Sequence, residues 1–190
     1  MSNEQVRTAD HPLPKVAVIV PCYNEEAVIK ESYRRTRTVL DRLPQQTEII
    51  YINDGSSDQT RSLLDRIAAT DPKVKVLHFS RNFGHQPAVT AGINHCDADF
   101  AIIMDADMQD PPELIPDLLR KQAEEQANVV YCVRRSRAGE SFFKLFTAKA
   151  FYRVMNRMSE VHFPLDTGDF RLIDRKVIAA FNRFHERGKY

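Results

Sequence analysis

Carboxylate side chains gather directly after an apolar run in the middle of the sequence. The run Ala101–Met104 leads into Asp105, Asp107 and Asp110, and Gln109 lies between the last two. A short apolar run bounded by turn residues is typical of a buried strand, and unpaired charge near a core is costly. We therefore expect a cation here. Oxygen ligands at positions 105, 107 and 109 suit Mg²⁺ or Mn²⁺, which proteins hold through one or two carboxylates while substrate phosphates complete the coordination. The alternative is a strand-end turn whose aspartates cap the next helix.

Three further groups of polar residues follow other apolar runs. Tyr23 and Glu25 could contact a nucleobase and its ribose, or serve as an apolar plug and a helix-start carboxylate. Asp54 could accept hydrogen bonds from a base or a ribose, or brace a turn. Arg81 and His85 could meet phosphate oxygens or lie at the surface, and the surface interpretation is the simpler one for His85.

Strands and helices are predicted to alternate between residues 15 and 133. The predicted strands are 15–20, 48–53, 74–80, 99–104 and 128–133, with helices between them, the second capped by Ser57 or Asp58. This alternation implies an α/β fold with a mainly parallel, Rossmann-like sheet flanked by helices. Ligands of such sheets lie beyond the carboxyl ends of the strands, so the polar groups above should meet at one edge. The sequence contains no GxGxxG or GxxxxGK[ST] motif, and a dinucleotide-binding fold or a P-loop therefore has no support.

A basic and aromatic stretch follows residue 133. Arg134, Arg135 and Arg137 form a short cluster, and residues 141–158 interleave aromatic and methionine side chains with lysines and arginines. This pattern suits an amphipathic helix in a membrane interface, and a helix packed on the domain's own core is the alternative. Asp169 then precedes a predicted strand at 170–173, where it caps a turn or faces an acceptor. A last helix is expected from residue 175 to 184.

The composition of the sequence argues against several classes of protein. The net charge is +1, so no overall field indicates a nucleic-acid partner. The three cysteines lie far apart without a CxxC pair, which favours reduced thiols in the cytoplasm and argues against zinc. No signal-peptide core precedes the first strand, and no apolar run approaches the ~20 residues that a membrane helix needs. A homo-oligomer is compatible with the sequence, which does not specify the number of subunits.

Four ordered motifs carry a resemblance to a known family. They are VPCYNEE at 20–26, NDGSSD at 53–58, DADMQDPPE at 105–113 and TGDFRL at 167–172. Together they resemble the signatures of family-2 glycosyltransferases with the GT-A fold. The similarity is greatest to the branch that glycosylates polyprenyl phosphates, which includes bactoprenol glucosyltransferases and dolichol-phosphate mannose synthases. The resemblance spans about residues 15–187, and the set of four motifs is far more specific than any one of them.

The resemblance implies a metal-dependent, inverting transfer of a hexose or modified sugar from a UDP- or GDP-linked donor to a polyprenyl phosphate. The implied donor-binding residues are Pro21, Tyr23, Glu25, Asp54 and Asp105, and the implied metal ligands are Asp105, Asp107 and Gln109. Asp169 matches the proposed catalytic carboxylate, and Arg134, Arg135, Arg137 and Arg171 would bind the acceptor phosphate. Two alternatives stay open: a transferase with a polysaccharide or soluble acceptor, and a non-catalytic module that binds nucleotide-sugars.

The resemblance also implies a domain organisation and a location. Residues 1–14 are expected to be a disordered leader, and residues 15–190 a GT-A domain that is shorter at its C-terminus than members of this branch. The chain is expected to be a fragment or a short form. It would work in the cytoplasm, peripherally on the inner face of the cell membrane, with the helix 141–158 bringing the site to the bilayer surface.

Overall fold

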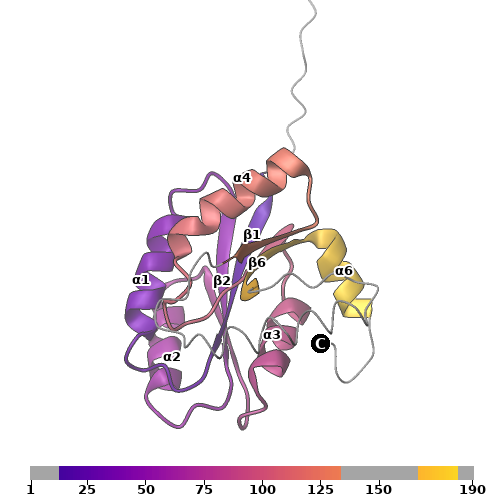
Figure 1. Cartoon of the computed structure of the whole chain (residues 1–190). Helices are drawn as coiled ribbons and strands as arrows, with labels where there is room; N and C mark the ends of the chain where they lie inside the picture. The colour runs from indigo at the N-terminus through magenta and orange to yellow at the C-terminus, as the bar shows by residue number, and fades with distance from the viewer. Residues whose placement is uncertain (1–12, 134–166, 184–190) are drawn as a thin grey trace, which may run out of the picture.

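The computed structural model describes residues 13–133 and 167–183, which form a sheet with helices on both faces (Figure 1). In chain order the elements are β1 (Lys15–Cys22), α1 (Ile29–Leu40), β2 (Gln46–Asn53), α2 (Thr60–Thr70), β3 (Val74–His78), α3 (His85–Asn94), β4 (Phe100–Ile103), the 3₁₀ helix η1 (Pro112–Leu114), α4 (Ile115–Glu125), β5 (Val129–Val133), β6 (Thr167–Asp174) and α6 (Arg175–Arg183). The predicted α/β class and the alternation of strands and helices up to residue 133 are confirmed.

The sheet has six strands in the order β3-β2-β1-β4-β6-β5. The pairs β1–β2, β2–β3 and β1–β4 are parallel, and β6 is antiparallel to both β4 and β5. The chain therefore builds outward from β1 in one direction and then returns to add β4 on its other side. The carboxyl ends of the neighbouring strands β1 and β4 therefore form the switch point at which open α/β sheets bind ligands.

Both faces of the central strands are buried, which explains their continuous apolar sequences. Helices α1, α2 and α4 cover one face, and residues of β1, β2 and β4 such as Val18, Tyr51 and Ile102 pack against them. Helices α3 and α6 cover the other face, where Ile19, Ile52 and Ile103 lie. Figure 1 shows α1 and α2 on one side of the sheet and α3 and α6 on the other.

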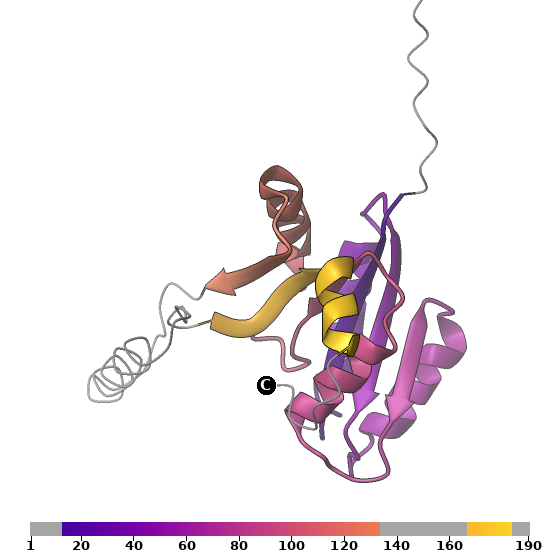
Figure 2. The same ribbon diagram turned by 90° about the vertical axis from the view of Figure 1, so that its right-hand side faces the viewer.

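The place of the last two strands could not be predicted from local sequence. The sequence predicts a mainly parallel sheet but not the neighbours of the strand 128–133, and in the structure β5 pairs with β6 alone among the described strands. β6 lies between β4 and β5. Its antiparallel register with β4 pairs Ile173 with Ala101 and Arg171 with Ile103. Figure 2 shows β5 and β6 extending out from one side of the domain.

Two further expectations concern helices. The predicted N-cap of α2 is wrong: the helix begins at Thr60 with Gln59 as N-cap, although the Asp58 carboxylate accepts a hydrogen bond from the Thr60 N–H at 2.9 Å. The expected interfacial helix 141–158 lies outside the described residues, as do residues 1–12 of the expected leader 1–14. Among the helices that are described, none is long and apolar enough to cross a membrane.

Candidate active site

A cavity of about 320 Å³ opens at the switch point between β1 and β4. Six of the predicted donor-binding or metal-binding residues line it: Pro21, Tyr23, Glu25, Asp54, Asp105 and Asp107. They lie at or just after the carboxyl ends of three parallel strands, β1, β2 and β4. The prediction that these loops meet at one edge of the sheet is therefore confirmed.

The loop after β1 and the loop after β2 are tied together by hydrogen bonds. The backbone N–H of Asn24 donates to the Ser56 hydroxyl at 2.9 Å, and the N–H of Ser57 donates to the Asn24 side-chain oxygen at 2.9 Å. Next along the chain, the N–H of Glu25 donates to the buried Thr60 hydroxyl at 2.8 Å. Glu26 and Gln59 continue the pattern, because the Gln59 N–H donates to the Glu26 carboxylate. These bonds fix the backbone that carries Tyr23 and Glu25.

Asp54 organises the loop that follows β3. Its carboxylate is 3 % exposed and accepts hydrogen bonds from the N–H groups of Phe83 at 2.7 Å and Gly84 at 2.8 Å. Gly55 allows this close approach, since a Cβ atom there would lie 2.2 Å from the backbone carbon of Arg81. Asp54 thus braces a loop, one of the two roles open from the sequence, while also lining the cavity. A carboxylate has about four lone-pair sites, so these two bonds leave acceptor capacity for a ligand.

The loop from residue 81 to 84 supplies residues to the cavity that the sequence analysis missed. Asn82 and Gly84 line it, and so do Cys22 and Ala88. The signal available was their position after β3, at the ligand-binding edge. Arg81 is not among the lining residues: its guanidinium carbon lies 4.3 Å from the centre of the Phe83 ring.

His85 is exposed, as the surface interpretation expected, and it also lines the cavity. It begins α3 and places its Nδ1 atom 3.9 Å from an oxygen of Asp105. Nothing local in the sequence indicates this contact, because the two residues follow different strands.

Part of the cavity lining is acidic, because it contains Glu25, Asp105 and Asp107. Burial raises the pKa of the Glu25 carboxyl, and the negative charges of Asp107, Asp105 and Asp58 raise it further. Burial also raises the pKa of the Cys22 thiol, and Glu25 and Asp105 add to the effect. A carboxyl group whose neighbours disfavour its ionised form sits in a negative field, and a cation would relieve that field.

The residues present fit a hard divalent ion that takes part of its coordination from a ligand. Asp105 and Asp107 face the cavity with Glu25, and oxygen is the donor type that Mg²⁺ and Mn²⁺ prefer. Within residues 13–133 and 167–183, no three His, Cys, Asp or Glu side chains are placed to hold a metal by themselves. Gln109 does not line the cavity, and its backbone N–H donates to the Asp107 carboxylate at 3.0 Å. The arrangement matches an ion held by one or two carboxylates and by phosphate oxygens.

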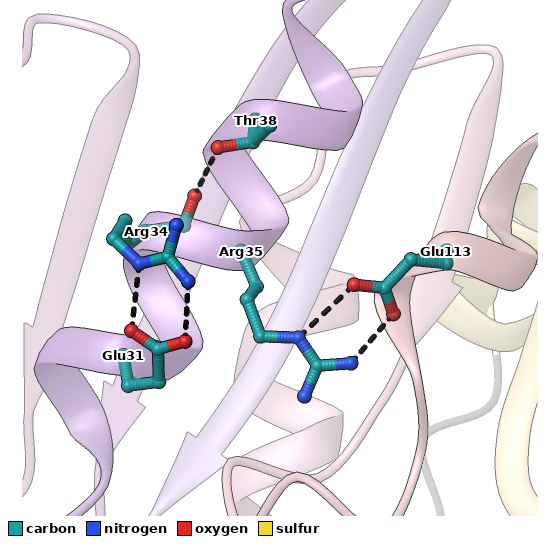
Figure 3. A network of polar contacts seen from close by, with 5 residues as sticks. All are labelled: Glu31, Arg34, Arg35, Thr38 and Glu113. Atoms are coloured by element: carbon teal, nitrogen blue, oxygen red, sulfur yellow. Dashed lines mark hydrogen bonds and ion pairs between the residues drawn. The ribbon is translucent and has the colours of Figure 1, made fainter.

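An ion pair at the surface contacts the end of the acidic segment, residues 105–113. Arg35 of α1 makes two parallel hydrogen bonds to Glu113, at 3.0 and 2.7 Å, and Glu113 lies in η1 (Figure 3). On the same helix Arg34 pairs with Glu31, and the Thr38 hydroxyl donates to the Arg34 carbonyl. The Arg35–Glu113 pair thus joins α1 to the segment that starts at Asp105.

The predicted acceptor residues are only partly described. Asp169 lies inside β6, so a turn before the strand is the wrong interpretation. β6 leads from Arg171, the partner of Ile103, toward the edge where β4 ends, and Asp169 is two residues further in that direction. Arg171 is not among the residues that line the cavity. Arg134, Arg135 and Arg137 lie outside the described residues.

The comparisons with known proteins agree with these observations. Residues 17–181 match the sequence profile of Glycosyl transferase family 2. An uncharacterised glycosyltransferase of Bacillus subtilis is 45 % identical over 92 % of this chain and 54 % of its own length. A bactoprenol glucosyl transferase of Shigella phage SfV is 38 % identical over 93 % of this chain and 57 % of its own length. The chain thus spans about half the length of the curated relatives it matches.

A solved structure shares the fold. A mannosyltransferase from Pyrobaculum calidifontis, in complex with GDP-Man and Mn²⁺, superposes with a TM-score of 0.64. The two sequences are 23 % identical, and the match covers 88 % of this chain and 46 % of the other.

Proposed function

Because the chain belongs to glycosyltransferase family 2, we propose that it binds a nucleotide-sugar in the cavity at the switch point and transfers the sugar to a polyprenyl phosphate. The observation that carries the proposal is the convergence of Tyr23, Asp54 and the Asp105–Asp107 segment on one cavity. We call the part of the lining formed by Tyr23, Asp54 and Asn82 the nucleoside side, and the part formed by Glu25, Asp105 and Asp107 the acidic side. This arrangement suits a ligand with a base at one end and a diphosphate at the other.

The nucleoside would lie on the side formed by Tyr23, Asp54 and Asn82. The Tyr23 side chain is 47 % exposed, so its ring is available to a flat ligand. The remaining lone pairs of Asp54 would accept from a base N–H or a ribose hydroxyl. The nucleotide would be UDP or GDP, and the relative from Pyrobaculum, whose structure contains GDP-Man, supports the general class.

The diphosphate would lie on the acidic side. Asp105 and Asp107 would hold a Mg²⁺ or Mn²⁺ ion, with Glu25 close to it. When bound, the ion would neutralise the negative charge that develops on the departing nucleoside diphosphate. The Mn²⁺ in the Pyrobaculum structure supports this assignment.

The transfer itself is a single displacement. An oxygen of the acceptor phosphate forms a bond to the anomeric carbon as the bond from that carbon to the donor's phosphate oxygen breaks, and the nucleoside diphosphate departs with the electron pair. The configuration at the anomeric carbon is inverted. A phosphate is already ionised near neutral pH and needs little deprotonation, so Asp169 would serve by positioning Arg171 or a metal-linked group as readily as by accepting a proton.

The acceptor would be a polyprenyl phosphate at the cytoplasmic face of the membrane. The relatives named bactoprenol glucosyl transferase support this choice. Arg171 and the cluster of Arg134, Arg135 and Arg137 would bind the acceptor phosphate, because guanidinium groups match phosphate oxygens. An amphipathic helix over 141–158 would place the site at the bilayer surface.

The test is a transfer assay with radiolabelled UDP-glucose and GDP-mannose, supplied with Mn²⁺ and either undecaprenyl phosphate or free sugars as acceptors. We expect a labelled lipid product with one of the two donors and none after EDTA treatment. Labelling of free sugars alone would contradict the lipid acceptor. Calorimetry with the same donors separates binding from turnover, and donor binding without any transfer would indicate a donor-binding module.

A variant series assigns the acceptor side. Replacing Asp169 with Asn should lower turnover while donor affinity stays nearly unchanged, and full activity would remove Asp169 from the mechanism. Replacing Arg135 and Arg137 with alanine should raise KM for the lipid more than KM for the donor. Equal losses for both substrates would indicate a structural role.

A further inference from the structure

A chain of hydrogen bonds runs from the surface of α2 to the loop that carries Tyr23. Its central member is Asn53, the last residue of β2, whose side chain is 1 % exposed. The Asn53 amide contacts His78, the last residue of β3, at 3.0 Å. The other ring nitrogen of His78 lies 2.9 Å from the Asp65 carboxylate on α2.

The direction of every bond in this chain is determined by one backbone group. The Ser56 N–H can only donate, and it donates to the Asn53 side-chain oxygen at 3.1 Å. The remaining Asn53 atom is the NH₂ group, which is a donor, so the Nδ1 atom of His78 must accept. The Nε2 atom of His78 then carries the proton and donates to Asp65. This one tautomer satisfies both partners of the ring, the Asn53 amide and the Asp65 carboxylate, at once.

The series of hydrogen bonds continues into the loop after β1. Asn53 holds the backbone of Ser56, and the Ser56 hydroxyl accepts a hydrogen bond from the N–H of Asn24. Asn24 has a φ of 56°, in the left-handed region that side chains other than glycine seldom adopt. The side-chain oxygen of Asn24 accepts from the Ser57 N–H, so this conformation is held by the turn after β2. Tyr23, which immediately precedes Asn24, depends on the same turn for its orientation.

We propose that His78, acting through Asn53, is a positioning residue for the nucleotide-sugar: it holds the 53–57 turn, and through it the Tyr23 loop, in the conformation that binds the nucleotide. This inference rests on the proposed function. His78 is not among the residues that line the cavity, so its effect is indirect. None of the four sequence motifs includes His78, which lies between the second motif and the third.

The test compares two substitutions at one position. His78→Leu removes both bonds and leaves the Asn53 NH₂ group without an acceptor, whereas His78→Gln keeps one acceptor and one donor on a planar group. Calorimetry with UDP and GDP in the presence of Mn²⁺ measures affinity at a temperature at which every variant is folded. For the nucleotide that binds, we expect His78→Leu to weaken affinity roughly tenfold and His78→Gln to stay within about threefold of the wild type.

A matched control is His95→Leu, because His95 is exposed at the C-cap of α3 and its ring nitrogen contacts the Ala91 carbonyl of its own helix. This variant should bind like the wild type. In the transfer assay the His78→Leu variant should show a raised donor KM with kcat nearly unchanged, which a general loss of stability would not produce. Equal affinities for His78→Leu and the wild type would overturn the positioning role while leaving the proposed function intact. A wild-type chain that binds neither nucleotide would overturn both.

Discussion

The two sides of the cavity are stabilised in opposite ways. On the nucleoside side, polar groups have protein partners: the Asp54 carboxylate accepts two backbone N–H groups, and the loops after β1 and β2 exchange hydrogen bonds. On the acidic side, burial raises the pKa of Glu25, and the negative charges of Asp107 and Asp105 raise it further. The first side is therefore preorganised by the fold, and the second stays electrostatically unfavourable until a cation binds.

The contrast separates two kinds of carboxylate by what their removal costs in folding stability. Removing a carboxylate from the nucleoside side should reduce the free energy of unfolding, because backbone donors lose their acceptors. Removing one from the acidic side should change that free energy less, because the loss relieves negative charge and the one backbone bond to Asp107 is exposed, while function is lost. Each of the following predictions tests one part of this difference.

The largest effect is expected on catalysis, from Asp107→Ala. Loss of a metal-binding carboxylate should lower turnover roughly 1,000-fold, since the ion's contribution to the barrier is several kcal/mol. Nucleotide affinity should also lose its dependence on Mn²⁺. The measurement is a titration with and without EDTA, and the melting temperature without metal should not fall. Unchanged affinity in both conditions would refute the metal assignment.

The next largest effect is expected on stability, from Asp54→Ala. The N–H groups of Phe83 and Gly84 would lose a buried, charged acceptor, and the free energy of unfolding should fall by on the order of 3 kcal/mol. Urea denaturation measures this change. Asp54→Asn is the control, because an amide oxygen keeps one acceptor and the loss should be smaller. If Asp54→Ala proved as stable as the wild type, the two sides of the cavity would not differ as described.

A smaller effect of opposite sign is expected from Glu25→Gln. The folded state raises the pKa of Glu25 above the ordinary value of 4.5, so ionised Glu25 opposes folding at neutral pH. The variant should therefore melt slightly higher than the wild type at pH 7 without metal, by less than about 3 °C. The difference should disappear as the pH falls below 4.5, where Glu25 is protonated in both states. Addition of Mn²⁺ and nucleotide should stabilise the wild type more than the variant, and thermal shifts under the two conditions measure both effects.

The smallest effect is expected from the Arg35–Glu113 pair, which lies at the surface outside the cavity (Figure 3). Arg35→Glu and Glu113→Arg should each cost no more than about 1 kcal/mol of unfolding free energy. The double variant should recover most of that loss, because it restores an ion pair of reversed polarity. Double-mutant analysis by urea denaturation, with Mn²⁺ affinity as a second readout, shows whether this pair anchors the acidic segment. Additive losses would mean that it does not.

Much of the site was predictable because its residues follow buried strands. Apolar runs ending at Val20, Asn53 and Met104 indicated strands, and parallel strands place their carboxyl ends at one edge. Tyr23, Asp54 and the aspartates after β4 could therefore be brought together without a structure. The same reasoning did not single out Asn82, and it expected His85 at the surface without expecting it to line the cavity, because the loop after β3 shows no carboxylate cluster.

The amino-acid sequence by itself determined the α/β class, the order of strands and helices up to residue 133, and the edge at which the polar motifs meet. These follow from the spacing of apolar residues, which is a local property of the chain. Only the tertiary structure decided that β6 separates β4 from β5, that Asp54 binds the backbone of Phe83 and Gly84, and that His78 supports Asn53. Such contacts join residues 25 or more positions apart, and they depend on which strands pair and in which register.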